Sequence, residues 1–187
     1  MLNRMFCLVA FLTMNISLSA AEKPNVLFIA VDDLNHWVGH LGRNSQTKTP
    51  NIDRLAKMGV TFTKAYCAAP VCNPSRAALM SGLRPGSTGV YDNGQDWKKV
   101  IPKEQTLTTQ FLNAGYKVYG AGKIYHSSAH REGEWTDYFE GGPQKVKAHA
   151  SAKNDGVGGI RFKPLTNDSI LQDESIVDYG IKILGQA

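Results

Sequence analysis

The segment Val26–Val31 reads VLFIAV and is followed at once by two acidic residues, Asp32 and Asp33. Six consecutive apolar residues, rich in β-branched side chains and ended by charged ones, are typical of a strand that is covered on both faces. Such strands belong to parallel sheets with helices on either side. We therefore predict a central parallel strand at residues 26–31 and an α/β fold.

Helix-like and strand-like patterns alternate downstream of this segment. Thr49–Gly59 combines a capping residue, a first-turn proline, one apolar face and a final glycine, which together predict a short helix. The same reasoning predicts helices at Ser75–Met80, Thr106–Ala114 and Asp173–Leu184, and strands at Val60–Tyr66 and Tyr116–Tyr119. Alternation of this kind indicates βαβ units.

Residues 127–167 have a different composition. Ser, His, Gly, Asn and Lys dominate there, and apolar residues come singly. We predict that this stretch is an irregular surface excursion.

The first 21 residues have the composition of a secretory signal peptide. Arg4 is their only charged residue, the apolar run Met5–Leu12 follows, and small residues precede a cleavage point before Glu22. The apolar run is shorter than the roughly 20 residues that a membrane span needs. We therefore expect residues 1–21 to be removed, no membrane span, and a single exported domain over residues 22–187, which is periplasmic or extracellular, or lysosomal or secretory in a eukaryote.

Composition excludes several classes of protein. The chain has 187 residues, of which 42% are hydrophobic and 20% charged, with a net charge of +5. These values are ordinary for a globular protein and exclude a disordered, collagenous or coiled-coil chain. The basic residues are spread along the sequence rather than gathered in a stripe, so we expect no nucleic-acid partner.

Asp32 and Asp33 are candidate metal ligands. Ligands collect at the carboxyl ends of strands in open α/β sheets, where these two residues are expected to lie. Hard divalent cations bind through carboxylate oxygens. The alternative, which two adjacent aspartates leave open, is that they begin a polar loop and cap nearby amides.

The second candidate group of residues lies within Cys72–Gly82, which reads CNPSRAALMSG. Pro74 suits the first turn of a helix, so Cys72 is expected at the positive end of the helix dipole, where a nucleophile or an anion is stabilised. Arg76, one turn later, offers a fork of donors suited to a tetrahedral oxyanion. A buried structural cysteine and a disulfide with Cys67 remain open as alternatives.

The pattern Cys-x-Pro-Ser-Arg, four further residues, and then Ser or Thr and Gly resembles the signature of type I sulfatases, and Cys72–Gly82 meets every fixed position. The resemblance extends over Lys23–His126. It includes the strand with its aspartates, the Thr49–Gly59 helix, and a second signature at Gly115–His126. The three-residue step from Lys123 to His126 is similar to the iduronate-2-sulfatase branch.

The resemblance implies a fold and a set of cofactors. The fold is the mostly parallel sheet, flanked by helices, of the alkaline phosphatase superfamily, of which this chain is the N-terminal part. An activating enzyme converts the signature cysteine, here Cys72, to formylglycine. Asp32, Asp33 and the formylglycine from Cys72 then contribute oxygens to Ca²⁺.

The resemblance also implies a reaction and the roles of three more residues. Arg76 holds the formylglycine, Lys123 binds a sulfate oxygen, and His126 hydrogen-bonds the formylglycine hydrate. The reaction is hydrolysis of a sulfate ester, and sulfated carbohydrate is the substrate class that the branch suggests.

Two other functions remain open. Some hydrolases of phosphate or phosphonate esters in the same superfamily share the Cys-x-Pro-Ser-Arg element, and a non-catalytic remnant would share it too. The family's later metal and sulfate ligands follow the region that resembles this chain, which stops at Ala187. We therefore expect the chain on its own to be inactive.

Overall fold

The computed structural model describes residues 23–126, 130–142, 156–157, 160–161 and 171–186. The predicted signal peptide, and the parts of the predicted excursion at 127–129, 143–155, 158–159 and 162–167, lie outside the described residues. In chain order the elements are η1 (Gly39–Leu41), α1 (Pro50–Met58), α2 (Cys72–Ser81), α3 (Pro85–Thr88), η2 (Trp97–Lys99), η3 (Lys103–Gln105), α4 (Leu107–Asn113), β1 (Tyr119–Ala121), β2 (Asp137–Phe139), β3 (Gly156–Val157), β4 (Ile160–Arg161) and α5 (Gln172–Leu184).

The four predicted helices are confirmed as α1, α2, α4 and α5. Helix α1 begins at Pro50 after the cap position Thr49 and ends before Gly59, as the sequence predicts. Helix α2 begins three residues earlier than expected, at Cys72, and ends at Gly82, whose φ of 72° and backbone N–H to Ala78 form a left-handed C-cap. Local signals therefore located the helices well, because proline and glycine act on the backbone within a few residues; none of the four N-cap side chains makes a capping hydrogen bond.

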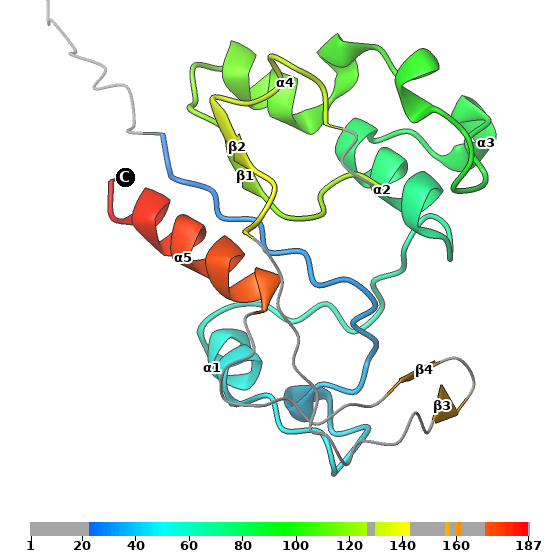
Figure 1. Cartoon of the computed structure of the whole chain (residues 1–187). Helices are drawn as coiled ribbons and strands as arrows, with labels where there is room; N and C mark the ends of the chain where they lie inside the picture. The colour runs from blue at the N-terminus through cyan, green and yellow to red at the C-terminus, as the bar shows by residue number, and fades with distance from the viewer. Residues whose placement is uncertain (1–22, 127–129, 143–155, 158–159, 162–170, 187) are drawn as a thin grey trace, which may run out of the picture.

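The strands β1 and β2 pair in parallel, so the α/β class with a parallel sheet is confirmed, although only in a small part of the expected sheet. Helix α5 packs against this pair (Figure 1): the Tyr179 hydroxyl donates to Asp137 Oδ2 at 2.9 Å, and the Tyr179 ring stacks on Phe139. Strand β1 lies slightly downstream of the strand that we predicted at Tyr116–Tyr119.

The prediction that residues 127–167 are an irregular surface excursion is wrong at the buried Glu134 and at the strands β2, β3 and β4. Strand β2 lies in this range, and Glu134 is completely buried. Thr136 explains part of the difference, because its backbone N–H donates to Val118 O at 2.7 Å while its hydroxyl accepts from Val118 N at 2.9 Å. Polar residues thus join the sheet through hydrogen bonds that an apolar pattern does not reveal.

The predicted strands at Val26–Val31 and Val60–Tyr66 are wrong for this chain, since neither segment is in a strand. Within the first of these segments, the four apolar residues from Val26 to Ile29 are 59–68% exposed. At one end Lys23 Nζ donates to Ala114 O, and at the other Asp32 pairs with Lys123, so the segment follows the direction of β1 (Figure 1). A strand requires a hydrogen-bonded neighbour, and the described part of the chain supplies none here.

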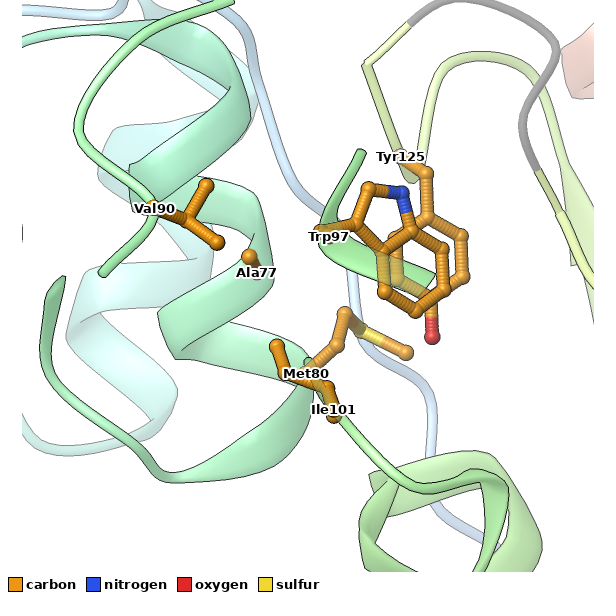
Figure 2. Packing of buried hydrophobic residues seen from close by; sticks show 6 residues of the cluster. All are labelled: Ala77, Met80, Val90, Trp97, Ile101 and Tyr125. Carbon is orange, nitrogen blue, oxygen red and sulfur yellow. The ribbon is translucent and has the colours of Figure 1, made fainter. Parts of the chain in front are cut away.

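The buried core lies between α2, the segment 90–101 and the loop after β1. It consists of Ala77, Met80, Val90, Trp97, Ile101 and Tyr125. Figure 2 shows the Trp97 and Tyr125 rings face to face, with centroids 4.1 Å apart and planes inclined by 12°. Helix α2 contributes Ala77 and Met80, from its second half, to this core, so the packing of the core holds the helix that carries Cys72.

Replacing Trp97 with alanine is expected to lower the free energy of unfolding by about 3–5 kcal/mol, because it leaves a large cavity beside Tyr125. Urea denaturation followed by circular dichroism measures the change. Trp37→Ala is the matched control, since Trp37 is 49% exposed, and it should cost far less. Equal losses in the two variants would contradict the packing described here.

Among the described residues, no helix combines the length and apolar character that a membrane crossing requires.

Candidate active site

The N-terminus of α2 is held in place by Asn73, the residue after Cys72. The Asn73 side chain is buried and donates to Asp92 O at 2.9 Å and to Gln95 O at 2.7 Å. The Asn73 backbone N–H donates to Asn93 Oδ1 at 2.9 Å. The turn at residues 92–95 therefore satisfies donors at the start of the helix and fixes the position of Cys72.

Arg76 projects from α2 toward Asp32 and the loop after β1. Its Nη2 lies 2.6 Å from Asp32 Oδ1, and its Nη1 donates to Ile124 O at 3.1 Å and also to Lys123 O. The Arg76 side chain is only 11% exposed. One guanidinium thus joins the end of the Val26–Val31 segment to the backbone that carries Lys123.

Lys123 completes a compact group of charges around Cys72. Its Nζ lies 2.7 Å from Asp32 Oδ2 and 3.8 Å from Cys72 Sγ. The hydrogen bond from Lys123, with Arg76 beside it, holds the pKa of Asp32 below its ordinary value, and the bond to Asp32 raises the pKa of Lys123. The structure therefore brings together four of the six predicted site residues: Asp32, Cys72, Arg76 and Lys123.

Asp33 adopts an unusual backbone conformation next to this group. Its φ is 55°, and it is the only residue other than glycine with positive φ in the described part of the chain. Aspartate tolerates the left-handed region better than most residues, yet the conformation still has an energetic cost and is typical of functional sites. Within the described residues, no hydrogen bond or ion pair joins Asp33 to the other predicted site residues.

His126 lies three residues beyond Lys123 and lines a cavity of about 210 Å³. The other walls are Asn73 and residues 93–98. The cavity therefore borders the residue next to Cys72 on one side and His126 on the other. His126 and Asn73 thus line the same cavity, and the role of His126 toward the formylglycine hydrate stays a prediction.

The donors fit a hard cation in type but not in number. Asp32 and Asp33 supply carboxylate oxygens, whereas Ca²⁺ takes about six to eight oxygen ligands. Across the described ranges, no group of three or more His, Cys, Asp or Glu side chains is placed to hold a metal. The two carboxylate oxygens of Asp32 form ion pairs with the side chains of Arg76 and Lys123 instead.

The disulfide alternative is wrong, since Cys67 and Cys72 are both free thiols. Cys67 is exposed, while Cys72 is partly buried at the start of α2.

The contacts of Asp32 predict a dependence of stability on pH. Because the folded pKa of Asp32 lies below the ordinary value of 3.8, its ion pairs stabilise the fold above that pH and are lost as the pH falls through the folded pKa. Asp32 is 44% exposed, so the contribution should be at most about 1 kcal/mol. Thermal melts from pH 7 to pH 3 should show a smaller acid-induced loss in Asp32→Asn; an unchanged pH profile would contradict the pairing.

Sequence reasoning missed three residues that shape the site. Asn73 anchors the helix start, while Trp97 and Tyr125 support the loop that carries Lys123 and His126. The signal for Tyr125 was its position between these two predicted residues. Asn73 and Trp97 gave no signal, because their roles depend on contacts with segments distant in sequence.

Comparison with known proteins finds a match to the family model described as Sulfatase over residues 24–181. A sulfatase from Formosa agariphila is 48% identical over 118 residues, which cover 58% of this chain and 22% of that protein. Iduronate 2-sulfatase from Mus musculus is 36% identical over 108 residues, covering 58% of this chain and 19% of that protein. Choline-sulfatase from Rhizobium meliloti is 37% identical over 103 residues, which cover 55% of this chain and 20% of that protein. The chain thus spans about a fifth of the length of these curated relatives.

Proposed function

The chain belongs to the sulfatase family, and on that basis we propose that it supplies the nucleophile side of an active site that hydrolyses sulfate esters. The observation that carries the proposal is the convergence of two cations on Cys72 and Asp32. Lys123 Nζ lies 3.8 Å from Cys72 Sγ, and Arg76 Nη2 lies 2.6 Å from Asp32 Oδ1. The negatively charged oxygens of a substrate sulfate group would be attracted to these two cationic side chains.

Electrostatics supports this reaction. The charge of a sulfate ester lies almost wholly on its oxygens, both in the ground state and during transfer. Arg76, Lys123 and the N-terminus of α2 present fixed positive charge there before the substrate arrives, and preorganised charge of this kind lowers the barrier.

Cys72 is proposed to be the nucleophile after oxidation to formylglycine by a sulfatase-activating enzyme. One hydroxyl of the hydrated aldehyde attacks sulfur as the ester S–O bond breaks and the alcohol leaves. The second hydroxyl then loses its proton as the C–O bond to sulfate breaks, which releases sulfate and regenerates the aldehyde. The position of Cys72 as the first residue of α2, partly exposed and held by its buried neighbour Asn73, suits a side chain that must meet a substrate.

Ca²⁺ is proposed as the metal, with Asp32, Asp33 and the formylglycine from Cys72 as its ligands in this chain. When bound, the ion would polarise sulfate oxygens and add positive charge to the site. Two carboxylates and one formylglycine do not fill the shell of about six to eight oxygens, so the proposed ion needs further oxygen ligands.

We propose a sulfated carbohydrate as the substrate and an exported location for the protein. The cavity beside His126 is lined by amide and charged side chains, including Asn93, Asp96 and Lys98, which suits a hydroxylated leaving group. The signal-peptide pattern at residues 1–21 supports export.

The test is to express the complete reading frame that encodes this chain, with a formylglycine-generating enzyme, and to assay paired esters. We expect calcium-dependent hydrolysis of 4-nitrophenyl sulfate at a far higher kcat/KM than of 4-nitrophenyl phosphate. A preference for the phosphate ester would identify a phosphoesterase instead. Finding neither activity while Cys72 is fully converted would refute the proposed reaction.

A further inference from the structure

Glu134 is a buried carboxylate that the proposed reaction does not use. Its side chain is fully buried, with Oε2 accepting from the Tyr125 hydroxyl and Oε1 from Thr106 Oγ1, both at 3.3 Å. Arg131 Nη1 lies 3.5 Å from Oε1. Burial raises the pKa of Glu134, which shows that its environment penalises the charged form. A buried carboxylate is costly unless it is paired, so its partners indicate what it organises.

The first partner, Tyr125, leads directly to the candidate active site. Tyr125 is 2% exposed, with its hydroxyl on Glu134 and its ring on Trp97. It is the second residue after Lys123 and immediately precedes His126. Fixing both ends of this side chain therefore fixes the short stretch of backbone from which Lys123 and His126 project.

The second partner, Arg131, contacts Trp97, the residue on which the Tyr125 ring stacks. Its guanidinium lies over the Trp97 ring, 4.7 Å from the ring centroid. Its Nη2 donates to Lys98 O at 2.6 Å and also to Ile101 O, which fixes the segment that carries Trp97. Contacts thus form a closed ring from Glu134 to Tyr125, Trp97, Arg131 and back to Glu134 (the stacked pair is shown in Figure 2).

We propose that Glu134 is a positioning residue, which acts through Tyr125 to hold the Lys123–His126 segment so that the Lys123 ammonium lies against Cys72. Arg76 also holds this segment, by donating to the carbonyl of Ile124. The proposal concerns the same site as the proposed function. Its test reads the Cys72 thiol directly, so its failure is distinguishable from a failure of the sulfatase proposal.

The experiment measures the rate at which iodoacetamide alkylates Cys72, at a fixed pH, in the full chain expressed without an activating enzyme. Cys67→Ser removes the other, exposed thiol of the described residues, and peptide mass spectrometry confirms the site. Iodoacetamide alkylates cysteine sulfur, and the Lys123 ammonium lies 3.8 Å from Cys72 Sγ. We expect Lys123→Met to slow the reaction about three- to tenfold, and Glu134→Ala to slow it by a comparable factor.

The deciding measurement is the double variant Glu134→Ala/Lys123→Met. If Glu134 acts through Lys123, the double variant reacts no more slowly than Lys123→Met alone, whereas independent effects multiply. Glu104→Ala is the control, because Glu104 is an exposed glutamate, and it should leave the rate unchanged. Multiplicative effects, or no effect of Glu134→Ala or Lys123→Met singly, would overturn the proposal.

A milder variant covers the case in which Glu134→Ala does not fold. Tyr125→Phe removes only the hydroxyl that contacts Glu134 and keeps the ring on Trp97. We expect it to slow alkylation about two- to threefold and to show the same lack of additivity with Lys123→Met. Tyr66→Phe, at an exposed tyrosine, is its control. A Tyr125→Phe rate equal to that of the parent would count against the proposal.

Discussion

Replacing Cys72 with serine in the complete enzyme is expected to abolish turnover of sulfate esters, by about 1,000-fold or more. Serine occupies the same position at the start of α2, so binding of the sulfate group by Arg76 and Lys123 should persist. Serine has a single hydroxyl, however, and a sulfate group transferred to it has no second hydroxyl through which to leave. The product released in a single turnover and the mass of the peptide that carries position 72 measure this outcome.

The matched control is Cys67→Ser, which changes the neighbouring exposed thiol and should keep full activity. A peptide carrying one added sulfate in Cys72→Ser, with no further turnover, would support the assigned role. Normal steady-state turnover by Cys72→Ser would exclude Cys72 as the source of the nucleophile.

Replacing Lys123 with methionine should lower kcat/KM for a sulfate ester by about 100- to 1,000-fold, the usual effect of removing one preorganised charge from a transferring oxyanion. Methionine keeps most of the length of the side chain but removes the ammonium that lies 2.7 Å from Asp32 Oδ2 and 3.8 Å from Cys72 Sγ. Steady-state kinetics with an aryl sulfate measure the loss.

Lys57→Met is the control for Lys123→Met, because Lys57 is exposed near the end of α1. Its activity should equal that of the parent. Should Lys123→Met lose less than about threefold, the ammonium would have no part in binding the sulfate oxygens.

Helices were the part of the fold that the sequence predicted well. Thr49, Pro50 and Gly59 bound α1 as expected, and Gly82 ends α2. These signals work because a proline or a glycine acts on the backbone within one turn. Strands were predicted poorly, because a strand depends on a partner elsewhere: VLFIAV has the composition of a central strand but is unpaired among the described residues.

Motifs located most of the site. The spacing around Cys72 and the resemblance at Lys123 selected residues that the structure brings into contact with Asp32. The sequence did not predict that a single carboxylate would join Arg76 and Lys123. That arrangement requires three segments to meet, and pairing preferences between distant charges leave no local pattern.

The sequence by itself determined where α1, α2, α4 and α5 lie and which residues are candidates for the site, because helix breakers and reactive side chains are properties of a few neighbouring residues. Only the tertiary structure decided which carboxylate pairs with which cation, and that Glu134, in a stretch without apolar pattern, is fully buried beneath Tyr125. The physical reason is that desolvation and ion pairing depend on distances between segments far apart in the chain.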